Sequence, residues 1–91
     1  MSGALKERKY HSLEEVLNAA DKKNWNDLRM DEIEDTEENR QIVEDGIFWC
    51  AIECVRLTYT RDSLHELIGW FVGLRELWNR RKDGEKHEHD T

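Results

Sequence analysis

Proline is absent from this chain of 91 residues. Because proline interrupts helices, its absence removes one of the usual signals of turns and loops. Alternation of apolar and polar residues is also scarce, whereas apolar residues recur at spacings of three and four. This periodicity predicts an all-α protein without strands. The chain has no internal repeat and no low-complexity linker, so we expect one small bundle of three to four helices.

Cysteine is nearly absent as well, with only Cys50 and Cys54. The two lie four residues apart on one face of an expected helix, where a mutual disulfide would be strained. No second cysteine pair or well-spaced histidine accompanies them, so we expect no metal and no cofactor. We interpret both as small apolar core residues of a protein from a reducing compartment, the cytoplasm or the nucleus.

Long apolar runs are missing. None approaches the roughly 20 residues that a membrane-spanning helix needs, and the N-terminus lacks the apolar centre of a signal peptide. The chain is therefore expected to be soluble and intracellular. The 21 acidic residues make pairs of carboxylates unavoidable, and no motif joins a nucleophile to a base and an oxyanion site. We predict that the protein is not an enzyme and has no small-molecule substrate.

Positive charge is in deficit, and the formal net charge is −7. Nucleic-acid-binding domains are normally basic, so this balance argues against a general polyanion binder. The charge is unevenly distributed, since residues 12–45 carry −8 and residues 75–82 carry +3. The acidic run from Asp31 to Asp45 is open to two interpretations. It is either a surface for a basic partner or a solvated turn and helix start, and the second is the commoner.

The ends of the chain are predicted to lie outside the folded domain. Residues 1–11 show little periodicity and are expected to be a flexible arm. A single helical domain is expected over residues 12–82, with its last helix ending at Asp83 and Gly84. Residues 83–91 form a polar tail that is expected to be disordered.

Three helix starts are recognisable within the domain. Ser12 to Glu15 has the spacing of a capping box and should open a helix that runs to about Ala20. The acidic segment 35–38 should open the central helix, and a second capping box at 63–66 should open the last one. Residues 25–34 carry a weaker apolar stripe, and their regular structure stays open.

The most informative segment is the last predicted helix, residues 62–82. Its apolar residues cover too much of the circumference to face one neighbour, and a chain this short has limited material to bury them. We therefore expect one face to pack within the monomer and the other to form an interface with a protein partner, most simply in a two-fold homodimer. The alternative is that the central helix and the Trp25 segment enclose it. The predicted interface residues are Gly69, Trp70, Phe71, Gly73, Leu74, Leu77 and Trp78.

Gly69 and Gly73 lie four residues apart in that helix. A strip without side chains lets another helix approach closely, and each glycine costs roughly 1 kcal/mol relative to alanine in a helix interior. We interpret the pair as a close helix crossing. Steric relief beside Trp70 and Phe71 is the alternative.

The basic end of the last helix is the only nucleic-acid signal in the sequence. Its arginines could straddle phosphates while an exposed Trp78 stacks on a base pair, for example of double-stranded RNA. Cations near a helix C-terminus also complement the helix dipole, and this second interpretation is favoured. The residues concerned are Arg75, Arg80, Arg81 and Lys82.

These observations predict a small regulatory interaction protein, such as an adaptor, an inhibitor or an accessory factor. It would act by binding a macromolecular partner, and occupying a surface of that partner would be its whole mechanism. Nucleic-acid binding through the basic end of the last helix is the alternative function.

Overall fold

The computed structural model describes residues 8–56 and 61–90, with the side chains of residues 8–56 and 62–82. Regular structure within these ranges is helical throughout, which confirms the predicted all-α fold. The elements are α1 (Leu13–Lys22), the 3-10 turns η2 (Trp25–Asp27) and η3 (Met30–Glu32), α2 (Glu37–Arg56) and α3 (Arg61–Asp90).

Helix α1 begins where the capping-box spacing predicts it. The Ser12 hydroxyl accepts a hydrogen bond from the Glu15 amide (3.1 Å), and the Glu15 carboxylate accepts one from the His11 amide (2.9 Å). The first bond satisfies an amide that has no partner inside the helix. Asn24 adopts a left-handed conformation with φ 61° and follows the end of the helix closely.

The connection between α1 and α2 is not a regular helix. It makes the two 3-10 turns η2 and η3, with Trp25 and Ile33 buried near its two ends. The apolar residues here are too widely spaced to fill one helix face, so only single side chains enter the core. The connection then leads into α2 at Thr36, whose hydroxyl accepts a hydrogen bond from the Asn39 amide (3.1 Å). The acidic segment 35–38 therefore opens the central helix as predicted.

Helix α3 begins at Arg61, just before the predicted start at Ser63. Its backbone continues through Asp83 and Gly84 to Asp90, so the helix does not end at these two residues as predicted. One glycine costs only about 1 kcal/mol in a helix, and no proline follows to stop it. The predicted tail at 83–91 is thus helical in its backbone as far as Asp90.

Residues 8–11 lie along α2 and are not a free arm. The backbone amides of Lys9 and Tyr10 each donate to the buried Asp45 carboxylate at 3.1 Å. The Trp49 indole donates to the Tyr10 carbonyl at 2.9 Å. Of the predicted arm, residues 1–7 lie outside the described residues. Backbone amides leave no trace in an apolar pattern, which is why the sequence did not reveal this docking.

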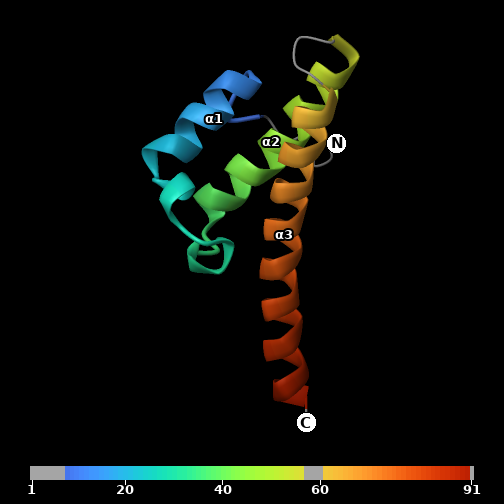
Figure 1. Cartoon of the computed structure of the whole chain (residues 1–91). Coiled ribbons are helices and arrows are strands. Elements are labelled where there is room, and N and C mark those ends of the chain that lie inside the picture. Colours follow the sequence, from blue (N-terminus) through green and yellow to red (C-terminus); the bar gives the residue numbers. More distant parts are fainter. Residues whose placement is uncertain (1–7, 57–60, 91) are drawn as a thin grey trace.

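Helix α2 is the centre of the molecule. Both α1 and α3 pack on α2, α1 also packs on η2, and α3 on η3. Figure 1 shows α1 and α3 on either side of α2 rather than packed mainly on each other. The core forms along α2, and its largest fully buried side chains are Trp78, Phe71 and Leu13.

Helix α3 packs the Phe71 ring directly against Gly46 of α2. A Cβ atom at this position would lie 2.5 Å from a ring carbon of Phe71, so a larger residue requires the ring or a helix to move. The buried stripe of α2 is accordingly centred on Ile42 and Gly46. Val43 and Cys50 belong to this buried stripe, whereas Ile47 is only half-buried.

Candidate functional site

The predicted interface residues of α3 separate into two groups. Phe71, Leu74 and Trp78 are buried in the monomer core, with at most 1% of their surface exposed, so this fold does not offer them to a partner. The others reach the surface: Gly69 is exposed, whereas Trp70, Gly73 and Leu77 are half-buried. For these three residues the structure therefore favours the alternative, burial within the monomer.

Gly69 and Gly73 do not mark a close crossing within the monomer. A Cβ atom at Gly69 would meet nothing within 4 Å, and one at Gly73 would make ordinary contact with Met30 at 3.7 Å. The glycine that a close crossing requires is Gly46 on α2, facing Phe71. The crossing predicted at Gly69 and Gly73 would join two copies of the chain, and it stays a prediction.

The basic end of α3 is engaged within the chain. The Arg75 guanidinium pairs with the Glu44 carboxylate at 3.3 Å, and Arg81 donates to the Asp31 carbonyl at 3.0 Å. Arg80 and Lys82 are exposed. Trp78, the predicted stacking residue, is fully buried and its indole donates to the Ile33 carbonyl at 3.0 Å. No observation on these residues favours the nucleic-acid alternative.

The acidic run faces this basic end. Arg40 bridges both oxygens of Asp35, at 2.5 and 2.8 Å, and donates to Asn79 on α3 at 3.1 Å. The hydrogen bond from Arg40 lowers the pKa of Asp35 below its usual 3.8, and the positive charges of Arg40, Lys82 and Arg81 act in the same direction. Part of the acidic run is therefore neutralised inside the molecule.

The two cysteines are free thiols, and Cys50 is buried. Burial raises the pKa of the Cys50 thiol to about 11, with the neighbouring Cys54 and Glu53 acting in the same direction. Cys50 is thus a neutral core residue at pH 7, as the sequence predicts. Among the described residues, no group of three acidic, histidine or cysteine side chains is placed to hold a metal ion.

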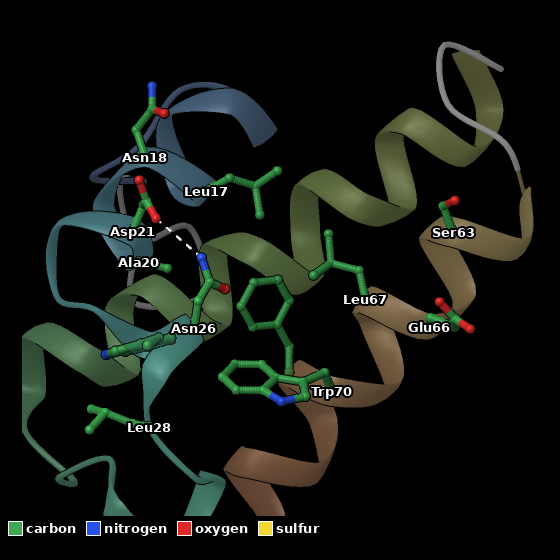
Figure 2. A pocket seen from close by; sticks show the side chains of 12 residues that line it. Leu17, Asn18, Ala20, Asp21, Asn26, Leu28, Ser63, Glu66, Leu67 and Trp70 are labelled. Carbon is green, nitrogen blue, oxygen red and sulfur yellow. Dashed lines mark hydrogen bonds between the residues drawn. The ribbon is translucent and has the colours of Figure 1, made fainter.

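A groove opens between α1 with η2 on one side and the N-terminal half of α3 on the other. Its volume is about 720 Å³, within the range of sites that hold ligands. Figure 2 shows Leu17 on α1 and Leu67 on α3 at opposite sides of it. The residues that line the groove are Leu17, Asn18, Ala20, Asp21, Trp25, Asn26, Leu28, Ser63, Glu66, Leu67, Trp70 and Phe71.

The floor of the groove is aromatic. Trp70 stacks at a tilt on the buried Trp25, with ring centroids 5.7 Å apart, and meets the edge of Phe71 at 5.8 Å. Trp70 is only half-buried, and Leu28 keeps 39% of its surface exposed. Protein-binding hot spots typically contain large apolar side chains of this kind, which pack on the core with one face and leave the other face accessible to a partner.

The rim of the groove is polar and acidic. Asp21 on α1 and Glu66 on α3 contribute carboxylates from its two walls, and the lining contains no lysine, arginine or histidine. Asp21 also accepts a hydrogen bond from the Asn26 amide group at 3.1 Å, which holds the α1 edge to η2. The groove therefore offers apolar contact and negative charge.

Of the groove residues, the sequence predicted only Trp70 and Phe71 as site residues. Leu17 lies on α1, and its exposure depends on how far α3 lies from α1. Leu28 follows a 3-10 turn and carried no periodic signal. The sequence contains these side chains, and only the packing of α1 and α3 on α2 brings them together.

Asp45 is the strongest polar feature that the sequence did not predict. Its carboxylate is fully buried and accepts hydrogen bonds from Arg8 (3.3 Å), the Lys9 and Tyr10 amides and Gln41 (2.9 Å). The Arg8 guanidinium lies 4.3 Å above the Phe48 ring. Four donors compensate the burial of this charge, so Asp45 is a structural anchor for residues 8–10.

Comparison of the chain with protein-family models, curated proteins and solved structures found no match. None of the helices in the described ranges combines the length and the apolar character that crossing a bilayer requires.

Proposed function

We propose that this protein is a non-enzymatic binding protein whose groove between α1 and α3 receives part of a macromolecular partner. The observation that carries the proposal is that the half-buried Trp70 and the exposed Leu28 line one groove of about 720 Å³. It would act by occupancy, as an adaptor, inhibitor or accessory factor does. The free thiols of Cys50 and Cys54 support a reducing compartment, the cytoplasm or the nucleus.

The packing beneath the groove supports a protein partner. Trp25 and Phe71 are buried and hold Trp70 from below, so the aromatic floor is fixed before any partner arrives. A preorganised aromatic anchor loses little conformational entropy on binding. The polar rim then excludes water around the apolar contact, as it does at known hot spots.

Selection from a displayed library of random peptides tests this proposal. The library is selected on the wild-type protein, and binding is remeasured on Leu28→Arg, a change at an exposed position that should not unfold the chain. We expect selected peptides to bind the variant about tenfold more weakly or worse, since a loss of 1.4 kcal/mol is tenfold. Glu76→Arg adds an arginine to an exposed position of α3 outside the groove and should leave binding unchanged.

The proposal fails if no peptide is selected, or if Leu28→Arg and Glu76→Arg bind the selected peptides equally well. Circular dichroism of each variant separates a lost site from a lost fold.

A homodimer is a second candidate, favoured by a different surface from the one predicted. Val55 on α2 is 82% exposed and Phe48 is 36% exposed, one apolar pair on the outward side of the central helix. A two-fold interface on α2 would cover them. Light scattering should then give twice the 10.9 kDa chain mass for the wild type and the monomer mass for Val55→Glu. A monomeric wild type at high concentration would exclude the dimer.

A further inference from the structure

The groove has walls of helix on both long sides. On α3 its lining residues follow at spacings of three and four, through Ser63, Glu66, Leu67 and Trp70. On α1 the lining runs through Leu17, Asn18 and Asp21 with the same spacing. Side chains at these spacings form ridges along a helix, and the shape that fits between two such ridged walls is a third helix.

The need to satisfy backbone hydrogen bonds also favours a helix in the groove. The floor and lower walls are apolar, formed by Leu17, Leu67, Trp25, Trp70 and Phe71. An extended segment pressed against them would bury amide and carbonyl groups, and the described part of the chain presents no strand edge to pair with them. A helix satisfies its own backbone groups and can present an apolar stripe to such a floor.

The charge of the rim specifies the flanks of that helix. Asp21 on one wall and Glu66 on the other place a carboxylate on each side of the apolar floor. Lysine or arginine on both edges of the incoming stripe would complement these carboxylates.

We infer that the groove between α1 and α3 binds an amphipathic helix of a partner protein that carries lysine or arginine on both sides of its apolar stripe. This inference rests on the proposed function and names the partner's chemistry. The acidic rim disfavours a nucleic acid or an anionic lipid surface at the same place, because both would bring negative charge to Asp21 and Glu66.

Three synthetic peptides test the inference. Each is about 18 residues long, enough to form a helix when bound, and has leucine at i, i+3, i+4 and i+7 with no tryptophan. The remaining positions are lysine in the first peptide, glutamine in the second and glutamate in the third. Binding is followed through the tryptophan fluorescence of the protein, and the stoichiometry by titration calorimetry.

We expect the lysine peptide to bind saturably at one peptide per chain, the glutamine peptide more weakly, and the glutamate peptide weakest. Glu66→Lys should weaken the lysine peptide by about tenfold, since it reverses a charge at the rim. Glu76→Lys is the matched control, because it makes the same change of net charge at an exposed position of the same helix outside the groove. It should weaken binding by less than about twofold, through the general loss of negative charge.

Results other than these would contradict the inference in different ways. Equal effects of Glu66→Lys and Glu76→Lys would show unspecific attraction to an acidic protein and overturn the inference. Binding of the glutamine or glutamate peptide as tight as that of the lysine peptide, lost in Leu28→Arg, would overturn the basic partner and leave the groove as a binding site. Failure of all three peptides to bind, or binding that Leu28→Arg does not change, would overturn the helical partner, and the library selection then decides the proposed function separately.

Discussion

Helix α3 is closed against α2 and open towards α1. On the α2 side, the Phe71 ring lies so near Gly46 that one added Cβ atom would collide with it. On the α1 side, a groove of about 720 Å³ lies between the side chains of the two helices. Both sides of α3 carry large apolar side chains, so the presence of such residues does not distinguish them.

The two sides differ in how closely the backbone of the neighbouring helix approaches α3. Gly46 lets α2 come close enough for the Phe71 ring to fill the space between the helices. Helix α1 instead packs on α2 and η2, which keeps it away from the N-terminal half of α3. In a chain of this size, the apolar surface divides into core and candidate binding site according to where a neighbouring backbone is able to approach.

The largest effect is expected at Trp78, on the closed side. Trp78→Ala removes a fully buried ring and leaves the Ile33 carbonyl without its donor, so it should lower the free energy of unfolding by about 3 to 5 kcal/mol. Chemical denaturation followed by circular dichroism measures this loss. A loss below about 1 kcal/mol would mean that the ring is not core and would reopen its role as an exposed stacking residue.

Gly46→Ala tests the close contact itself. The new methyl group would meet the Phe71 ring, and the expected loss is about 3 kcal/mol, at the upper end of overpacking effects. Phe71→Leu in the same chain makes room for the methyl group, so the double variant should lose less than the sum of the two single changes. Strict additivity in denaturant melts would show that the two residues do not touch.

Asp45→Asn probes a second closed surface, the one between α2 and residues 8–10. The substitution keeps the shape of the side chain but removes the charge that four donors share, which should cost about 2 kcal/mol. Hydrogen exchange of the Lys9 and Tyr10 amides should quicken more than that of amides in α3. Unchanged protection of these two amides would show that the carboxylate does not hold this segment.

The smallest effect is expected on the open side and has the opposite sign. Gly69→Ala adds a methyl group where nothing lies within 4 Å, so it should stabilise the chain by about 0.5 to 1 kcal/mol through helix propensity. The same substitution therefore destabilises at Gly46 and stabilises at Gly69. Thermal melts of the two variants compare them directly, and destabilisation by Gly69→Ala would indicate a helix crossing at that glycine after all.

The sequence alone was sufficient for the helical class and for most helix boundaries. Ser12 caps its helix as predicted, and Thr36 caps the central helix within the predicted start at 35–38, because a cap depends on residues within one turn of each other. The end of α3 was predicted too early at Asp83 and Gly84, since a single glycine is a weak stop signal in a chain without proline.

The candidate site was predicted only in part, for a different physical reason. Trp70 was predicted as an interface residue because the last helix has more apolar surface than one neighbouring helix can cover, and it does line the groove. Leu28 and Asp21 carry no such signal, since they become groove residues only through the positions of α1 and η2. Asp45 looked like one of many acidic surface residues, and its burial depends on backbone amides from the other end of the domain.

The pairing of α3 with the acidic run also affects the electrostatic field around the molecule. Arg75 contacts Glu44, Arg81 contacts the Asp31 carbonyl, and the charges of Arg81 and Lys82 act on Asp35. The positive segment at 75–82 is therefore offset nearby and does not form a separate pole, although the net charge remains −7. Within about one Debye length of the surface, about 8 Å at physiological salt, a basic molecule therefore meets an acidic body with a weakened dipole. The negative charge attracts it without fixing its orientation, which is decided by the contacts it makes.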